Sequence, residues 1–383
     1  MLFEQLGIVC TPPVDGHDIP ALKATLRRAL SSEVPVLVHV VTKKGAGYAP
    51  AEKDPSRFHG VGPFDRASGA SLKSSDSTLT YTQAFTYAFN QEAQRDDKIC
   101  AISAAMIDGT GLRDFATSHP DRCFDVGIAE AHAVGLASGL ALGGYKPLVA
   151  LYSTFLQRAI DQSIINVALC NLPVGFAIDR AGLVGDDGPT HHGMFDMALL
   201  RTIPNMRIIA PSNEAELVHA LHTAFMLPGP VALRYPRGSA QGVSLPQDPL
   251  YMKPGCARVV REGSDAAILA FGRMVGYALD AAHMLESEGH HVRVVDMRWV
   301  KPLDKEAIAE AAKTGIVVTV EDGVRIGGAG EGVAEELALQ GLNPSFENIG
   351  IPDSFIEQGK VDQLFADLGL DAQGIAQVIR KYL

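Results

Sequence analysis

Short apolar runs alternate with longer amphipathic segments along most of the chain. The runs have the length of buried strands and the segments have the length of helices, which is typical of a parallel sheet with helices on both faces. The runs after Thr78 predict strands at Ile99–Ile102, Pro147–Leu151, Val174–Asp179, Arg207–Ala210 and Val231–Arg234. The segments between them predict helices at Thr82–Arg95, Ala129–Gly143, Phe155–Cys170 and Glu214–Phe225. The pattern predicts a doubly wound α/β domain over residues 78–242.

The same alternation returns in the last third of the chain. It follows a segment from Ser239 to Pro254 that carries three prolines and no helical period, which indicates a linker. Further strands are predicted at Ala266–Ala270, His291–Val295 and Ile316–Val320, and helices at Val275–Glu288, Lys305–Ala312 and Gly330–Leu339. We therefore expect a second α/β domain over residues 250–383.

The first 59 residues predict only one helix, at Ala21–Leu30, and one buried strand, at Pro35–Val41. One helix and one strand cannot bury both of their faces. We therefore expect this segment to be the tail of a truncated domain that leans on further material. Residues 60–77 are rich in Gly, Ser and Asp and predict a second linker.

Composition narrows the class of protein. Hydrophobic residues make up 47% of the 383 residues and charged residues 20%, as in core-forming globular proteins. A net charge of -11 argues against nucleic acid as the main partner but allows a local basic pocket for an anionic metabolite. The five cysteines are scattered, without a C-x-x-C pair, and no apolar run has the length of a membrane span. We expect a cytoplasmic protein.

Glu130 is the first candidate for chemistry. It follows Ile128-Ala129 and opens a helix of small apolar residues. A poorly solvated carboxylate is expected to have a partner, a raised pKa or a function. The plain alternative is an acid that favours a helix N-terminus.

Other candidates follow predicted strands, where doubly wound sheets bind their ligands. Arg180 and Arg237 could together hold a phosphate or carboxylate, although either alone reads as a surface ion pair. Arg158 lies one helical turn after Phe155, a spacing that suits a planar ring but also an ordinary amphipathic helix. The loop 186–193 combines Asp186, Asp187, His191 and His192 without a spacing typical of metal ligands. The Gly-rich turn 327–332 contains Glu331, which would repel phosphate, so we expect a packing role.

Together these segments resemble the 1-deoxy-D-xylulose-5-phosphate synthase family, thiamine-diphosphate enzymes of the transketolase superfamily, over essentially all 383 residues. The Tyr-Ser-Thr-Phe-Leu-Gln-Arg and Asp-Arg-Ala-Gly runs are the most specific. The matching stretches are 13–18, 42–45, 47–48, 50–54, 128–130, 152–158, 179–182, 234–238 and 348–350. By this resemblance residues 1–59 are the tail of the diphosphate-binding domain, 78–242 the pyrimidine-binding domain and 250–383 the transketolase C-terminal domain.

The resemblance also implies a reaction and roles. Pyruvate is decarboxylated and its two-carbon unit joins glyceraldehyde 3-phosphate, the first step of non-mevalonate isoprenoid synthesis, which also feeds thiamine and pyridoxal synthesis. Glu130 would bond a ring nitrogen of the aminopyrimidine and so promote deprotonation of the thiazolium carbon. The other implied cofactor contacts are Tyr48, Lys44, Phe155, Arg158 and Ile128. Arg180 and Arg237 would hold the substrate phosphate, Tyr152, Asp187 and His191 would line the substrate site, and His59 and His191 would act in proton transfer.

The sequence departs from the family in one large respect. The Gly-Asp-Gly motif with a later Asn, which binds Mg²⁺ and diphosphate in the superfamily, is not found, so we expect no metal ligands in this chain. Smaller departures are Ala131, where the family usually has Gln, and Ser103-Ala104, where it usually has Thr-Pro. The resemblance further implies a homodimer.

Three interpretations stay open at this point. The chain is a fragment of a synthase or the second half of a split synthase whose partner chain carries the diphosphate domain. It is a subunit of another split thiamine-diphosphate enzyme, such as a transketolase or a 2-oxoacid dehydrogenase β subunit, although the segment from Tyr48 to Asp54 speaks against this. Or it is a non-catalytic dimerising partner.

Overall fold

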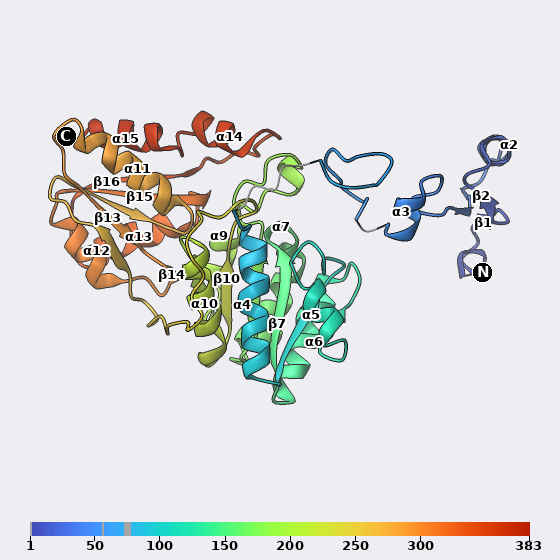
Figure 1. The fold of residues 1–383 in the computed structure, drawn as a ribbon, viewed down its shortest axis with the longest axis horizontal. Coiled ribbons are helices and arrows are strands. Elements are labelled where there is room, and N and C mark those ends of the chain that lie inside the picture. Colours follow the sequence, from blue (N-terminus) through green and yellow to red (C-terminus); the bar gives the residue numbers. More distant parts are fainter. Residues whose placement is uncertain (1, 56, 73–77) are drawn as a thin grey trace. The chain divides into compact units, whose positions relative to one another are not determined.

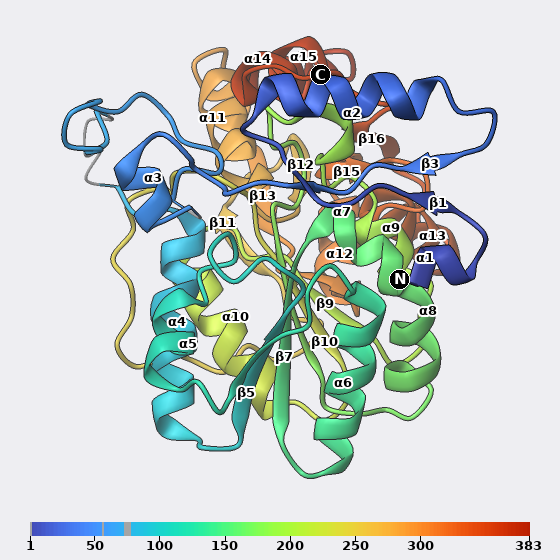
Figure 2. The same cartoon turned by 90° about the vertical axis from the view of Figure 1, so that its right-hand side faces the viewer.

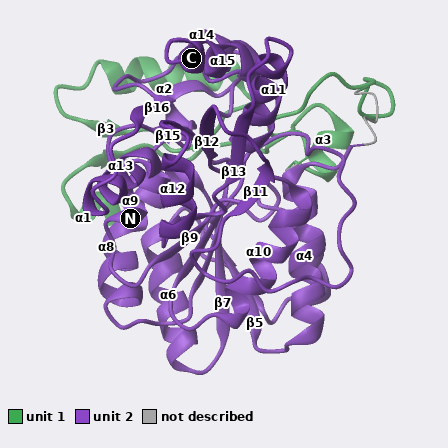
Figure 3. Ribbon diagram, turned by 90° about the vertical axis from the view of Figure 1, so that its left-hand side faces the viewer, with its two compact units in different colours: residues 1–77 green, residues 78–383 purple. Residues whose placement is uncertain are grey.

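A computed structural model describes residues 2–55, 57–72 and 78–383, and the chain divides into two compact units, residues 1–77 and 78–383 (Figure 3). The larger unit holds both predicted α/β domains. The predicted linker 60–77 ends where the larger unit begins, and its last five residues, 73–77, lie outside the described residues.

A seven-stranded sheet forms the centre of the first α/β domain, with the strand order β14-β9-β10-β8-β7-β5-β6. All of its pairs are parallel except β14 with β9, which confirms the predicted parallel sheet. The strands are β5 (Ile99–Ser103), β6 (Cys123–Asp125), β7 (Lys146–Tyr152), β8 (Gly175–Asp179), β9 (Arg207–Ile209), β10 (Val231–Arg234) and β14 (Trp299–Lys301). The buried runs read from the sequence therefore became the central strands.

Helices cover both faces of this sheet (Figure 2). One face packs on α4 and α10 around Phe85, Phe89 and Leu217, and the other packs on α6 around Val134 and Ala137. Thr80 and Gln83 form a capping box that starts α4, and the Asn213 side chain caps α10, so both helices begin at residues that satisfy free N–H groups. The helices are α4 (Tyr81–Arg95), α5 (Arg113–Ser118), α6 (Glu130–Leu142), α9 (Asp196–Arg201) and α10 (Glu214–Met226).

The single helix predicted at Phe155–Cys170 is wrong in detail. The segment consists of α7 (Ser153–Leu156), the 3-10 turn η1 (Gln157–Ala159), α8 (Ile160–Gln162) and the π-helical η2 (Ser163–Ala168). The spacing of apolar residues is nearly the same in α, 3-10 and π helices, so the sequence could not reveal where one type of helix changes into another. Short 3-10 and π segments often occur at functional sites, and here the 3-10 turn carries Arg158.

The second α/β domain has a five-stranded sheet in the order β11-β13-β12-β15-β16, in which only β11 is antiparallel. Strands β13, β15 and β16 of this sheet are labelled in Figure 1. Its strands are β11 (Arg258–Arg261), β12 (Ala266–Ala270), β13 (Val292–Asp296), β15 (Ile316–Val324) and β16 (Ser345–Ile351). Its helices are α11 (Met274–Glu286), α12 (Lys305–Ala312), α13 (Ala329–Leu339), α14 (Val361–Asp367) and α15 (Ala372–Arg380). The predicted second α/β domain is thus confirmed in its architecture.

The two α/β domains share one interior. Strand β14 belongs by sequence to the second domain but pairs with β9 of the first sheet. Between the domains the buried Arg234 guanidinium contacts Asp196 Oδ2 at 2.7 Å and Asp322 Oδ1 at 2.6 Å. Because a buried charge without a partner is costly, this triad holds the domains in one relative position.

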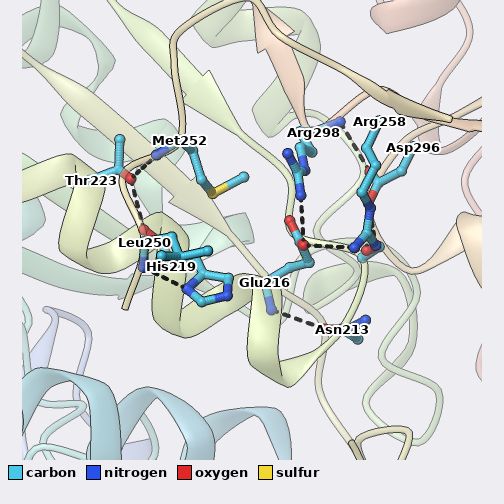
Figure 4. Close-up of polar contacts among 10 residues, drawn as sticks. Asn213, Glu216, His219, Thr223, Leu250, Met252, Arg258, Asp296 and Arg298 are labelled. Carbon is cyan, nitrogen blue, oxygen red and sulfur yellow. Dashed lines mark hydrogen bonds and ion pairs between the residues drawn. The ribbon is translucent and has the colours of Figure 1, made fainter. Parts of the chain in front are cut away.

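The segment 239–254, predicted as a linker, is an ordered strap along α10. Its backbone N–H groups donate hydrogen bonds to side chains of α10. Leu250 N donates to His219 Nδ1 at 3.0 Å, and Met252 N donates to Thr223 Oγ1 at 2.8 Å (Figure 4). On the same helix, Glu216 accepts from Arg298 at 2.8 Å. The segment is not helical, as its lack of a helical period predicts. The sequence gives no local sign of the tertiary contacts that order it.

The smaller unit contains two pairs of short parallel strands, β1 with β3 and β2 with β4. The continuous strand predicted at Pro35–Val41 is therefore wrong: it is divided into β3 and β4, which pair with different partners. The predicted helix is present as α2, and Asp18 caps it. The elements are α1 (Leu2–Gln5), β1 (Val9–Cys10), β2 (Val14–Asp15), α2 (Ile19–Leu30), β3 (Val36–Leu37), β4 (Val40–Val41) and α3 (Ala49–Lys53).

Candidate functional site

Three adjacent strands bring the predicted site residues to one edge of the larger sheet. Strands β10, β8 and β7 are neighbours and parallel, so their carboxyl ends lie side by side. Tyr152 ends β7, Arg180 follows β8, and Arg237 lies three residues beyond the end of β10. The sheet therefore gathers candidates that are 85 residues apart in the sequence (237 − 152) at the edge where such folds bind ligands.

Glu130 is the first residue of α6, and its side chain is only 3% exposed. Its Oε1 atom accepts a hydrogen bond from Arg158 Nη1 at 2.9 Å. The partner expected for a poorly solvated carboxylate is thus present. The position at a helix N-terminus also favours a negative charge, so the plain capping interpretation describes the same geometry.

An aromatic cluster continues from this ion pair. The guanidinium carbon of Arg158 lies 5.1 Å from the centroid of the Phe155 ring. Phe155 in turn stacks on Tyr152 at 5.8 Å between centroids and meets the His191 ring edge to face at 5.5 Å. On the far side of Tyr152, the Arg180 guanidinium carbon lies 3.6 Å from the ring centroid. Six predicted residues therefore form one continuous chain of contacts.

The two histidines of the loop 186–193 have different environments. His191 Nδ1 lies 2.8 Å from Thr190 Oγ1, and its ring faces Phe155. His192 is buried, its Nδ1 atom accepts from Val184 N at 3.1 Å, and burial lowers its pKa. His192 therefore has a structural contact, and only His191 belongs to the aromatic cluster.

Arg237 forms an ion pair with Asp187, with 3.0 Å between Nη1 and Oδ2, and both side chains are about two-fifths exposed. A ligand anion would replace Asp187 or bind beside it. The clamp of Arg180 with Arg237 stays a prediction. The same holds for the cofactor contact of Ile128, whose side chain is 80% exposed in the loop before α6.

The candidates of the smaller unit form a group of their own. Lys44 Nζ lies 3.1 Å from His59 Nδ1, so the structure brings these two predicted residues together. The Tyr48 hydroxyl donates to Arg66 O at 3.0 Å, and its ring packs on Phe58 and Phe64. That these residues share a site with Glu130 stays a prediction.

One residue at the sheet edge was missed as a functional candidate. Asp179 ends β8, is fully buried and accepts hydrogen bonds from Thr82 Oγ1 at 2.9 Å and from Arg180 N at 2.6 Å. Burial raises its pKa to about 7, against the opposing effect of Thr82 and Arg180. Its position at the end of an otherwise apolar strand, directly before Arg180, was the available signal.

The Gly-rich turn 327–332 has the expected packing role. The N-terminus of α13 is occupied by the buried Glu321 carboxylate, which accepts from Ala329 N and Gly330 N, both at 2.8 Å. Burial raises the Glu321 pKa to about 7 despite these bonds. A Cβ atom at Gly330 would lie 2.2 Å from Asn348 Oδ1, so the glycine is required by close packing.

Neither a metal cluster nor a membrane span is found in the part of the chain that the structure describes. Within residues 2–55, 57–72 and 78–383, no three His, Cys, Asp or Glu side chains lie close enough together to hold a metal ion. Across the same residues, no helix has both the length and the apolar character needed to cross a bilayer.

Comparison with known proteins divides the chain near the boundaries of the two α/β domains. Residues 77–242 match the family profile described as transketolase, pyrimidine binding domain, and residues 255–375 match transketolase, C-terminal domain. Residues 1–42 match a profile described as 1-deoxy-D-xylulose-5-phosphate synthase.

Curated relatives and solved structures agree with these profiles. Over its whole length the chain is 52% identical to a 1-deoxy-D-xylulose-5-phosphate synthase from Syntrophotalea carbinolica, and the match covers 61% of that protein. It is 49% identical to a synthase from Heliobacterium modesticaldum, of which the match covers 59%. It thus spans about three-fifths of these relatives. A solved split gene transketolase, described as an inactive β4 tetramer, is 33% identical, with a TM-score of 0.70 over 79% of this chain and 98% of that one. The chain belongs to the transketolase superfamily, and over its whole length it is similar to 1-deoxy-D-xylulose-5-phosphate synthases.

Proposed function

We propose that this chain provides the pyrimidine-binding and C-terminal domains of a 1-deoxy-D-xylulose-5-phosphate synthase, which condenses pyruvate with glyceraldehyde 3-phosphate and releases CO2. The observation that carries the proposal is the contact chain from Glu130 through Arg158, Phe155 and Tyr152 to Arg180. It joins a buried carboxylate, an aromatic surface and a cation at the ligand-binding edge of a doubly wound sheet.

The residues divide into two groups by their chemistry. Glu130 would hold a proton at a ring nitrogen of the aminopyrimidine, and Phe155 and Arg158 would orient that ring. Arg180 and Arg237 would bind the phosphate of the acceptor, while Tyr152, Asp187 and His191 would position its carbonyl. Charge-assisted hydrogen bonds from two guanidinium groups suit a phosphate.

The described residues fit only half of the cofactor. Thiamine diphosphate supplies the electron sink for the decarboxylation when it is bound. Glu130 and Phe155 would provide the acid and the ring surface for its pyrimidine. Mg²⁺ prefers carboxylate and carbonyl oxygens together with those of the diphosphate. No cluster of three His, Cys, Asp or Glu side chains that could hold a metal ion lies within the described ranges. We infer that the diphosphate domain, of which Lys44, Tyr48 and His59 would form the tail, supplies that half, either in a longer chain or as a partner chain.

A homodimer is part of the proposal. Helix α6 is apolar on nearly all sides, a composition that favours burial. Yet three apolar side chains near it are largely exposed: Leu142 at its end (75%), Ile128 before it (80%) and Leu169 after η2 (71%). A second copy packed on α6 would cover exposed apolar side chains of this kind. We also propose a cytoplasmic location, since the free state of all five cysteines suits a reducing compartment.

Calorimetry with thiamine diphosphate and Mg²⁺ tests the division of the cofactor site. We expect no detectable binding to the chain alone, because in this proposal its residues contact the ring and the diphosphate domain holds the diphosphate. Tight Mg²⁺-dependent binding would show that the chain anchors the diphosphate by itself, and the proposed division would be wrong.

Product analysis tests the reaction. The chain is mixed with the part of the Syntrophotalea carbinolica relative that it does not match, together with cofactor, pyruvate and glyceraldehyde 3-phosphate. We expect 1-deoxy-D-xylulose 5-phosphate, lost in Glu130→Ala and kept in Glu335→Ala, which changes an exposed acid of α13. The likeness to a split gene transketolase makes transketolase the second candidate function, and two-carbon transfer from a ketose phosphate with no use of pyruvate would favour it.

A further inference from the structure

Arg180 has an unusual backbone. Its φ angle is +62°, in the left-handed region that non-glycine residues rarely adopt. Such a conformation persists only where the surrounding structure holds it, and it occurs often at functional sites. Contacts around the turn after β8 must therefore hold Arg180 in this conformation.

The Asp179 carboxylate makes the most direct of these contacts. Its Oδ1 atom accepts the Arg180 N–H at 2.6 Å, and its Oδ2 atom accepts the Thr82 hydroxyl of α4 at 2.9 Å. Asp179 is fully buried, so water does not compete for either bond. The carboxylate thus ties the first residue of the turn to a helix on one face of the sheet.

The turn sets the direction of the Arg180 side chain. Tyr152 is the register partner of Asp179 on the neighbouring strand β7. The Arg180 guanidinium lies 3.6 Å from the Tyr152 ring centroid, within the range of a cation–π contact. Backbone contacts farther along also hold the turn, since Ala181 N donates to Tyr235 O at 3.0 Å and Gly182 exchanges hydrogen bonds with Gly193.

We propose that Asp179 is a positioning residue whose carboxylate, through the Arg180 amide and the Thr82 hydroxyl, fixes the turn that presents the Arg180 guanidinium to the phosphate of the acceptor aldehyde. The inference rests on the proposed function, in which Arg180 contacts that phosphate. Asp179 itself touches neither substrate nor cofactor in this scheme.

The test follows the Arg180 side chain directly, by NMR of the full chain labelled at arginine and assigned with Arg180→Lys. A guanidinium above the Tyr152 ring has ring-current-shifted signals. We expect this shift to be lost in Asp179→Ala and largely kept in Asp179→Asn, whose amide oxygen still accepts from Arg180 N. Asp296→Ala removes a carboxylate that is equally buried in the second domain and is expected to keep the shift.

A titration with glycerol 3-phosphate, a phosphate ester that cannot react, adds the link to function. Asp179→Ala should bind it about tenfold or more weakly than the unchanged chain, as expected for a displaced charge-assisted contact. Glycerol, which lacks the phosphate, serves as the control ligand.

The outcomes separate the two proposals. An unchanged ring-current shift in Asp179→Ala, or an equal loss in Asp296→Ala, would overturn the positioning role. If Asp179→Ala does not fold, Thr82→Val decides, since it removes one of the two bonds and should reduce the shift, whereas an unchanged shift overturns the role. A shift that depends on Asp179 in a chain without affinity for glycerol 3-phosphate would support the positioning role and contradict the proposed phosphate contact.

Discussion

Glu130 shows how one side chain satisfies two requirements at the residue scale. A carboxylate that is 3% exposed needs a partner, and Arg158 provides it while more than half of the Arg158 side chain stays in solvent. The ion pair therefore joins the acid to a cation that lies over the Phe155 ring. A ligand ring placed on Phe155 would meet both groups.

Arg158→Met tests this pairing. Removing the cation leaves the buried carboxylate without its hydrogen bond, which should lower the free energy of unfolding by about 1–3 kcal/mol. In the Glu130→Gln background the same change should cost less than about 1 kcal/mol, because no charge is left unpaired. Urea unfolding of the four proteins of this double-mutant cycle measures the difference. The contact of Arg158 with Phe155 is present in both backgrounds and cancels, so purely additive effects would contradict the pairing.

At the element scale, the sequence predicted the elements whose pattern of apolar residues is regular. The strands Val231–Arg234 and Ala266–Ala270 and the helix Lys305–Ala312 have the predicted bounds. Strands β10 and β12 are buried on both faces and therefore appear as continuous apolar runs. Helix α12 buries one face, with Ile308 and Ala311, and therefore shows a helical period. Short or edge elements such as β6, β11 and β16 lack such a run and were not predicted.

Elements whose structure depends on distant contacts could not be read from the sequence. The strap 239–254 is held by His219 and Thr223 of α10, and β3 and β4 are separated by their different partners. The same limit applies to the site. Residue types and strand ends pointed to Glu130, Arg158 and Arg180. The sequence does not show that Asp179 also contacts Thr82, which lies 97 residues earlier.

The N-terminal turn of α13 is an element where packing overrides helix propensity. An alanine methyl group at Gly330 would lie 2.2 Å from Asn348 Oδ1 and 2.6 Å from Thr319 Oγ1. Gly330→Ala should therefore lower the free energy of unfolding by about 1–3 kcal/mol, as overpacking does.

Gly276→Ala in the first turn of α11 is the matched control. Its nearest neighbour is the flexible end of Gln241 at 3.4 Å, so alanine should stabilise the chain by up to about 1 kcal/mol. Thermal unfolding of both variants measures the two effects. A similar small change in both would mean that the α13 turn is loosely packed.

At the scale of the whole molecule, buried polar networks join the two α/β domains. Besides the triad of Arg234, the carboxylate of Asp296 at the end of β13 accepts from Ser212 Oγ of the first domain at 2.7 Å. Arg258 bridges Asp296 at 3.6 Å and Glu216 of α10 at 3.3 Å (Figure 4). These contacts cross between the domains, so we expect residues 78–383 to unfold together.

Asp296 also makes the stability of this junction depend on pH. Burial raises its pKa to about 6, above the ordinary value of 3.8. Between these values the folded chain binds more protons than the unfolded chain, so the stabilising contribution present below pH 4 is lost as the pH rises through 6. A shift of this size corresponds to roughly 2–4 kcal/mol.

Asp296→Asn removes the titrating group and keeps an acceptor for Ser212. The stability of the unchanged chain relative to this variant should therefore fall between pH 4 and 7, by an amount of that order, and level off above pH 7. Denaturant unfolding across this range measures the difference in free energy of unfolding between the two proteins. The opposing titration of buried histidines such as His192 is present in both proteins and cancels in this difference. Asp248→Asn, at an exposed carboxylate of the strap, should follow the unchanged chain at every pH. A constant difference for Asp296→Asn would mean that Asp296 stays ionised throughout, held by Arg258 and Arg298, and that the junction is insensitive to pH.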